Sequence, residues 1–244
     1  MTSRAAPLRT AYRLLHARFG HQHWWPAPTP LEVCVGAILV QNTGWTQAER
    51  AVARLKSEGL LASVAALHAA PPGQVEEAIR SAGTYRVKAR RLRAFTQWIC
   101  AEFGGSLDRV WAGPMDQIRP RLLAVPGIGP ETADCMLLYA GNHHAFVLDA
   151  HTRRVFERHG WTVPGTGDDG LRATCERSLA DPEPTRQLDL WQDFHAQMVA
   201  VGKSHCRARD ARCDGCPLQP LLRPRRGEFS VSSFQFSAGK KKSE

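Results

Sequence analysis

Residues 122–152 constrain this chain more than any other segment, because they set a very short turn between two stretches of helix-forming residues. The turn reads PGIG over 126–129, which is too short and too rich in glycine to be anything else. Pro130 suits the first position of the following helix, where its missing N–H costs nothing. Backbone N–H groups beside a helix N-terminus form an anion site. Asp149 follows the turn by 20 residues, so the segment predicts chemistry on a nucleic acid backbone or sugar.

The amino-acid composition indicates the kind of partner and the cellular compartment to expect. Lysine and arginine outnumber aspartate and glutamate by 32 to 23, and the net charge of +9 favours a polyanionic partner, although many soluble proteins are also basic. No apolar run approaches the roughly 20 residues that span a bilayer, so no membrane partner is expected. The seven cysteines are odd in number and no secretory signal precedes them. We therefore expect a cytoplasmic protein whose thiols are reduced or metal-bound.

The residue pattern predicts an all-α chain. A first helix is indicated by apolar residues at helical spacing, namely Leu8, Tyr12, Leu15 and Phe19. Thr29 is expected to cap the next helix, while Thr46 and Glu49 resemble a capping box of a third helix that Gly59 would close. Further helices are expected over 73–82, 85–103, 114–124, 131–140, 150–159, 170–180 and 185–201. No run alternates with period two for long enough to predict a sheet.

Two adjacent motifs, VPGIGPETAD and VLDAHTRRV, resemble the helix–hairpin–helix and Gly/Pro-Asp signature of the endonuclease III superfamily of DNA glycosylases. The resemblance extends over about residues 8–222. It implies a helical barrel lobe over 28–140 that carries the hairpin, and a second lobe made of 1–27 and 141–222. It also implies that Gly127, Gly129 and Thr132 bind DNA phosphate. Residues 223–244 are basic and have no helical pattern, so we expect a mobile tail.

Asp149 is the expected catalytic residue, because a carboxylate near C1′ stabilises the charge that builds on the sugar when the glycosidic bond breaks. An aspartate directly before a helix is also a common N-cap, and the two roles are compatible. Glu131 stands where bifunctional members of the resembled family carry a lysine. A carboxylate cannot form an imine with the sugar. The resemblance therefore implies a monofunctional enzyme, with Glu131 either a first-turn helix acid or a contact to the base or water.

An aromatic cluster is expected to form the base pocket. Trp24, Trp25 and Pro26 precede the first barrel helix, and Trp45 follows the QNT run at 41–43. Indole faces attract a positively charged alkylated purine through a cation–π interaction. The WWP run and the aromatic after QNT resemble the 3-methyladenine-type subgroup of the family. The alternative is a cluster that only packs the two lobes together.

The same resemblance places Gln41 and Thr84 at the two positions that fill the gap left by a flipped base. Residues at the second position are usually bulkier than threonine, so Thr84 departs from the pattern. Both residues could instead be ordinary polar loop residues. Basic residues after Thr84 and within the cysteine loop are candidates for phosphate contacts: Lys88, Arg90, Arg91, Lys203, Arg207, Arg209 and Arg212.

Three cysteines near the end of the chain form a C-x6-C-x2-C pattern: Cys206, Cys213 and Cys216. The resembled family adds a fourth cysteine after five intervening residues and binds a [4Fe–4S] cluster, whereas this chain has Leu222 there. The pattern implies a cluster with one non-cysteine ligand; zinc with His205, or no metal, are the alternatives. The other cysteines lie in apolar helical context and are expected in the core: Cys34, Cys100, Cys135 and Cys175.

The sequence thus predicts a monofunctional DNA glycosylase of base excision repair that acts as a single chain on double-stranded DNA, with alkylated purines as its substrates. An oxidised-pyrimidine or mismatch glycosylase of the same fold is the first alternative. A lesion- or DNA-binding module with little catalysis is the second. Glu131, Thr84 and Leu222 keep the binding module open, and Asp149 argues against it.

Overall fold

The computed structural model describes residues 7–162 and 167–222. Within these ranges the regular structure is helical, apart from one isolated bridge between Cys206 and Ala211. The predicted all-α class is therefore confirmed, and the expected tail at 223–244 lies outside the described residues. In chain order the helices are α1 (Leu8–Phe19), α2 (Pro30–Leu39), α3 (Trp45–Ser57), α4 (Val64–Ala69), α5 (Pro72–Ala78), η1 (Arg80–Ala82), α6 (Tyr85–Phe103), α7 (Leu107–Trp111), α8 (Met115–Ala124), α9 (Pro130–Tyr139), α10 (Ala150–His159), α11 (Asp168–Ser178), α12 (Pro184–Ser204) and η2 (Gln219–Leu221).

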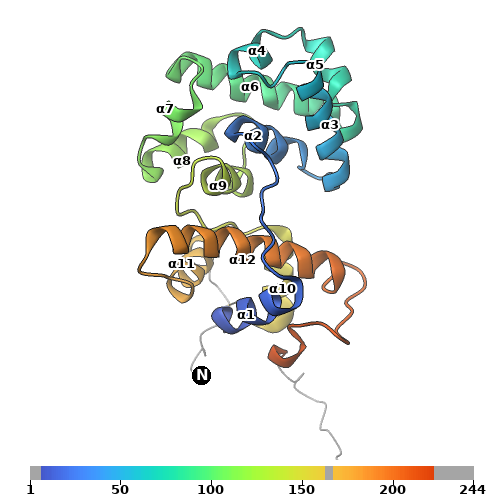
Figure 1. The fold of residues 1–244 in the computed structure, drawn as a ribbon, viewed down its shortest axis with the longest axis vertical. Helices are drawn as coiled ribbons and strands as arrows, with labels where there is room; N and C mark the ends of the chain where they lie inside the picture. Colours follow the sequence, from blue (N-terminus) through green and yellow to red (C-terminus); the bar gives the residue numbers. More distant parts are fainter. Residues whose placement is uncertain (1–6, 163–166, 223–244) are drawn as a thin grey trace, which may run out of the picture.

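The helices form two lobes, one above the other in Figure 1. Helices α2 to α9 make the upper lobe, and α1 joins α10, α11 and α12 in the lower lobe although the whole upper lobe separates them in sequence. The chain passes between the lobes twice, once through residues 20–29 and once through residues 140–149. The exact residue boundaries of the lobes stay a prediction.

The ends of several helices follow from local sequence. The Thr29 side chain accepts a hydrogen bond from the Glu32 backbone N–H, and Pro30 occupies the first turn of α2, as expected. The capping box expected at Thr46 is wrong, because α3 already begins at Trp45 and Gly44 occupies the N-cap position without a side-chain hydrogen bond. Gly59 follows the end of α3 with a φ of 73°, which suits glycine and ends the helix.

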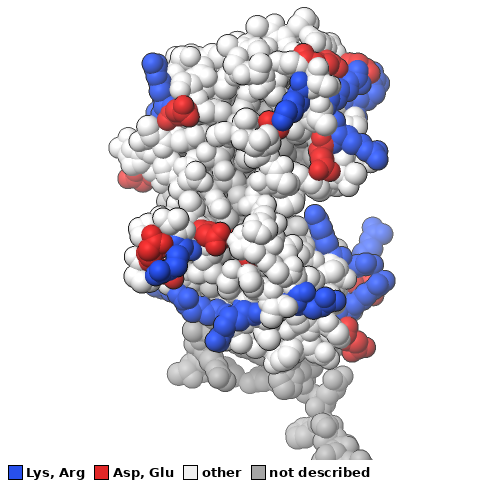
Figure 2. Space-filling view, in the orientation of Figure 1, with Lys and Arg blue, Asp and Glu red and all other residues white. Residues whose placement is uncertain are grey.

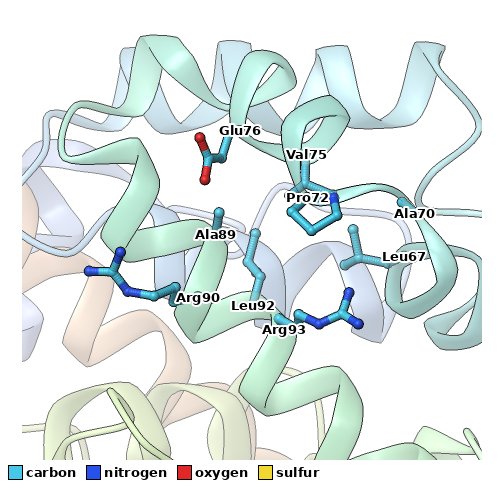
Figure 3. Close-up of a pocket in the computed structure, with 9 residues that line it drawn as sticks. All are labelled: Leu67, Ala70, Pro72, Val75, Glu76, Ala89, Arg90, Leu92 and Arg93. Carbon is cyan, nitrogen blue, oxygen red and sulfur yellow. The ribbon is translucent and has the colours of Figure 1, made fainter.

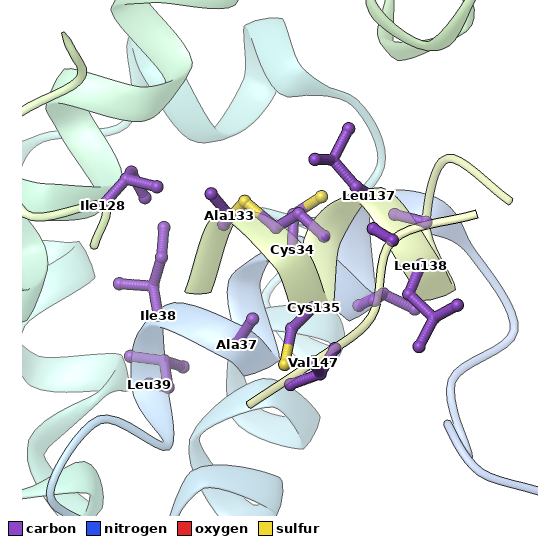
Figure 4. Close-up of a cluster of buried hydrophobic side chains, with 14 of the residues drawn as sticks. Cys34, Ala37, Ile38, Leu39, Ile128, Ala133, Cys135, Leu137, Leu138 and Val147 are labelled. Atoms are coloured by element: carbon purple, nitrogen blue, oxygen red, sulfur yellow. The ribbon is translucent and has the colours of Figure 1, made fainter. Parts of the chain in front are cut away.

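The hairpin helix α9 packs against α2 at the centre of the upper lobe (Figure 4). Nearly every residue of both helices is buried, so neither shows the one-sided pattern of a surface helix. Cys34 and Cys135 lie in this core, and Cys175 is buried in the lower lobe, as expected. Cys100 is only partly buried. Because α9 packs against α2, α8 and α12, the turn that precedes it has a fixed position.

Asp134 of α9 ties three helices together. Its carboxylate accepts hydrogen bonds from Arg119 Nε of α8 at 2.7 Å and from Arg172 Nη2 of α11 at 2.7 Å. The Asp134 residue is 1% exposed. Because α8 and α9 belong to the upper lobe and α11 belongs to the lower lobe, this ion-pair network connects the two lobes.

Candidate DNA glycosylase site

The glycine turn at 126–129 is held in place by side chains from α6 and from the loop after α2. Gly127 has a φ of 88°, and a Cβ at this position would collide with the Arg91 side chain, so glycine is required. Gln41 Nε2 donates to the Gly127 carbonyl at 3.1 Å and to Thr132 Oγ1 at 2.8 Å. Arg91 in turn donates to Gln41 Oε1. The exposed Gly127 and Gly129 therefore lie on a rigid surface, whereas the hydroxyl of the buried Thr132 is engaged by Gln41.

Asp149 begins α10 as its N-cap. Its Oδ1 accepts a hydrogen bond from the Thr152 backbone N–H at 2.6 Å, and the residue is 5% exposed. This bond fixes the orientation of the carboxylate and leaves Oδ2 on the other side. Asp149 is therefore an N-cap and also borders the cavity described next.

A cavity of about 420 Å³ lies between the lobes, a volume that suits a ligand of small-molecule size. It brings together residues from α2, α3, α9, α10 and α12 and from the segment before α2. Its predicted members are Trp24, Trp25, Gln41, Trp45, Glu131, Thr132 and Asp149, and its further polar members include His151, His195 and Lys203. Pro26 is exposed and does not line the cavity.

Glu131 and Asp149 line the same cavity. Shielding from water and the neighbouring Asp149 carboxylate raise the pKa of Glu131 to about 7. A carboxyl group with this pKa exists in both protonation states near neutral pH. It can therefore donate or accept a hydrogen bond.

The three indoles form one aromatic group. The ring centroids of Trp24 and Trp45 are 4.5 Å apart, and those of Trp25 and Trp45 are 5.2 Å apart at an interplanar angle of 79°. Trp25 also packs on Gly36 of α2 and lies 5.6 Å from the Tyr139 ring. Trp25 thus has a packing role, while all three rings also border the cavity.

The two expected wedge residues differ in their placement. Gln41 borders the cavity beside the hairpin, whereas Thr84 is exposed before α6 and does not line it. Lys88, expected among the phosphate contacts, is 1% exposed and cannot reach phosphate, so that expectation is wrong. Its Nζ donates to the Leu39 carbonyl at 2.8 Å, to Thr43 Oγ1 and to the Ala82 carbonyl at 2.6 Å. Lys88 therefore joins the two loops that carry the wedge positions.

The cysteine loop follows α12. Cys206, Cys213, Cys216 and Leu222 border one small cavity together with His159. Among the described residues, no three His, Cys, Asp or Glu side chains are arranged to hold a single metal ion. Arg158 holds the loop by donating to Cys206 Sγ at 3.3 Å and to the Arg207 and Ala208 carbonyls. The Nδ1 atom of His159 is buried and has no hydrogen-bond partner in the part of the chain that the structure describes.

The rest of the described surface offers less chemistry. An apolar hollow among α4, α5 and α6 is lined by Leu67, Val75 and Leu92 and shares no residue with the cavity between the lobes (Figure 3). Lys and Arg side chains border the waist of the molecule on its right side, on both lobes (Figure 2). No described helix has the length and apolar character needed to cross a membrane.

Several residues of the cavity carry no signal in a single-sequence motif. His195 is one buried position on α12, among apolar neighbours such as Phe194 and Met198. The sequence shows only that His195 is on the core-facing side of a predicted helix, and a buried histidine is more often structural than functional. Lys203 was expected to contact phosphate from the cysteine loop, and it lies instead at the end of α12 where it lines the cavity.

Comparison with known proteins agrees with this arrangement. Residues 35–180 match the HhH-GPD superfamily of base excision DNA repair proteins. A protein of Methanocaldococcus jannaschii, named as an inferred DNA repair glycosylase, is 39% identical over 209 residues, which cover 85% of this chain and 92% of the relative. A structure of an endonuclease III–DNA complex has a TM-score of 0.73 at 24% identity and covers 88% of this chain and 94% of that chain.

The fold is also that of Helicobacter pylori 3-methyladenine DNA glycosylase bound to 1,N6-ethenoadenine. That structure has a TM-score of 0.70 at 23% identity, and the match covers 81% of this chain and 97% of the other. A hairpin, a carboxylate at a helix N-terminus and an inter-lobe cavity occur together in this chain. The chain therefore belongs to the HhH-GPD superfamily of base excision DNA repair glycosylases.

Proposed function

We propose that this protein is a monofunctional DNA glycosylase that flips an alkylated purine out of double-stranded DNA and hydrolyses its N-glycosidic bond. The observation that carries the proposal is the shared cavity, which is lined by Asp149, by Glu131 and by three indoles. Asp149 would stabilise the positive charge on the sugar, and the indoles would stack on the base. The exposed turn at Gly127 and Gly129 would bind the phosphate backbone through its N–H groups. We further propose that the enzyme acts as a single chain in the cytoplasm.

The absence of a lysine at position 131 predicts base release without strand scission. An amine is needed to form the imine that leads to cleavage. Borohydride treatment of the protein on a lesion duplex should therefore give no covalent adduct above background, while alkali reveals abasic sites.

Lys203 provides the control for this experiment, because it is the only lysine among the described residues that lines the cavity. A trapped adduct that disappears in the Lys203→Gln variant would contradict the monofunctional assignment and identify the nucleophile. Release of oxidised pyrimidines or mismatched bases in preference to alkylated purines would favour the first alternative substrate class. Binding without any base release would favour a lesion-binding module.

The indole cluster predicts a preference for charged bases. Trp24→Ala and Trp45→Ala should slow excision of a cationic alkylpurine roughly 5- to 30-fold more than excision of neutral hypoxanthine, because only the cation gains about 1–2 kcal/mol from an indole face. Single-turnover rates on the two lesions measure this difference. Equal losses on both, with a lowered melting temperature, would support the packing role instead.

We also propose that the cysteine loop binds a [4Fe–4S] cluster through Cys206, Cys213 and Cys216. The three cysteines line one cavity, and each thiolate of a cluster would bind a different iron. The fourth iron needs a non-cysteine ligand, and the unpartnered His159 Nδ1 lines the same cavity. When bound, the cluster would hold the arginine-rich loop in place. Anaerobically purified protein should contain about 4 iron atoms per chain, and colourless protein without iron would contradict the proposal.

A further inference from the structure

His195 of α12 lies opposite the catalytic carboxylate. Its Nε2 is 3.8 Å from Asp149 Oδ2, and both residues line the cavity between the lobes. The His195 residue is 6% exposed. Burial lowers the pKa of His195 from its ordinary value, with the Asp149 carboxylate opposing that shift and His151 adding to it. The imidazole is therefore neutral at neutral pH, and only one of its two nitrogens carries a hydrogen.

The hydroxyl of Tyr139 determines which nitrogen that is. It lies 2.9 Å from the Gln192 carbonyl and 2.7 Å from His195 Nδ1. The hydroxyl donates its single hydrogen to the Gln192 carbonyl, which can only accept. The hydroxyl oxygen then accepts from His195 Nδ1–H. Since burial also raises the pKa of Tyr139 well above its ordinary value, the hydroxyl keeps its hydrogen at every pH at which the protein works.

Because the hydrogen is on Nδ1, His195 Nε2 carries a lone pair and is a hydrogen-bond acceptor near the Asp149 carboxylate. Asp149 Oδ1 is already occupied by the Thr152 backbone N–H, and Oδ2 accepts no hydrogen bond from the described residues. His195 Nε2 and Asp149 Oδ2 are thus two acceptor atoms 3.8 Å apart. Neither atom carries a hydrogen to donate, and the distance is too long for a hydrogen bond between them. A molecule with two hydrogens to donate satisfies both acceptors at once, and water is the smallest such molecule.

We propose that Asp149 Oδ2 and His195 Nε2 together bind the attacking water, with His195 as the base that takes its proton. The inference rests on the proposed hydrolytic function. Donation of both hydrogens aligns an oxygen lone pair away from the two acceptors and toward the sugar. The oxygen forms the new bond to C1′ while the C1′–N bond breaks. The bonding electrons leave with the cationic alkylpurine, which departs neutral, and the proton remains on His195 until solvent removes it.

Two substitutions of His195 distinguish a role of its Nε2 acceptor from a role of the ring in packing. His195→Asn keeps an N–H near the position of Nδ1 for Tyr139 and removes the acceptor at Nε2, whereas His195→Gln places an amide oxygen nearer the Nε2 position. We expect His195→Asn to lower the single-turnover excision rate about 100-fold, with duplex affinity changed less than threefold. His195→Gln should recover part of that loss. His16→Asn, on the exposed face of α1, should leave the rate unchanged.

The outcomes distinguish the inference from the proposed function. If the unaltered protein releases no base from any lesion duplex, the proposed function fails. If it releases bases and His195→Asn does so at an equal rate, His195 is not the base and the inference is overturned. A packing role would explain a different set of results, which would also overturn the inference. In that set, His195→Asn is slower and its melting temperature falls in proportion. Tyr139→Phe is slowed and destabilised to the same extent, and His195→Gln shows no recovery.

Discussion

Asp149→Asn is expected to lower the single-turnover rate of base release at least about a thousandfold while duplex affinity stays within a few-fold of the original. The amide keeps an oxygen for the Thr152 backbone N–H, so α10 retains its N-cap. The negative charge is lost, and that charge is needed mainly when the sugar becomes positive in the transition state. Rates on an alkylated duplex and affinities by fluorescence anisotropy measure the two quantities separately.

Asp149→Ala serves as the companion variant. It removes the cap as well as the charge, so it should lose about 1 kcal/mol of stability in addition to activity. A near-normal excision rate in Asp149→Asn would show that the carboxylate acts only as a helix cap.

Asp134→Ala is expected to have the largest effect on stability. Removing this buried carboxylate leaves Arg119 without its partner and Arg172 with only the exposed Asp169, which costs about 3–5 kcal/mol. For a chain of this size that loss corresponds to a fall of roughly 6–20 °C in the melting temperature. Calorimetry of the purified variant measures it directly.

The matched control is an ion pair on the surface. Glu58 accepts from Arg54 at 3.0 Å across one turn of helix, and both side chains are partly exposed. Glu58→Ala should cost less than about 1 kcal/mol, because solvent screens such pairs. Equal melting temperatures for Asp134→Ala and Glu58→Ala would refute a structural role for the network between the lobes.

Sequence reasoning predicted the long helices well and the short ones poorly. The expected ranges 85–103 and 150–159 coincide with α6 and α10, because each has a clear apolar stripe and a glycine after its end. The short helices α4 and α7 were not expected. Each spans at most two turns, and so few positions cannot display a period of 3.6 residues.

The site was predictable only where local motifs carry it. The glycine turn, Asp149 and the indoles are each short patterns with a chemical reason for their spacing. His195 and Lys88 are different, because their roles depend on contacts between segments distant in the sequence, such as Lys88 Nζ with the Leu39 carbonyl. No single-sequence pattern reports such a contact, and a lone lysine on a helix is ordinarily assigned to the surface.

The packing of α1 against α12 sets the order in which this enzyme can mature on the ribosome. The first helix to be synthesised finds its partner only after residue 204 has emerged, and until then Leu8 and Leu15 have no apolar surface to cover them. The hairpin helices can pack earlier, because α2, α8 and α9 all precede residue 140. The hairpin turn can therefore take its shape before the cavity between the lobes exists, because that cavity also needs residues of α10 and α12. A chain that ends after residue 140 is expected to fold around the hairpin and to release no base.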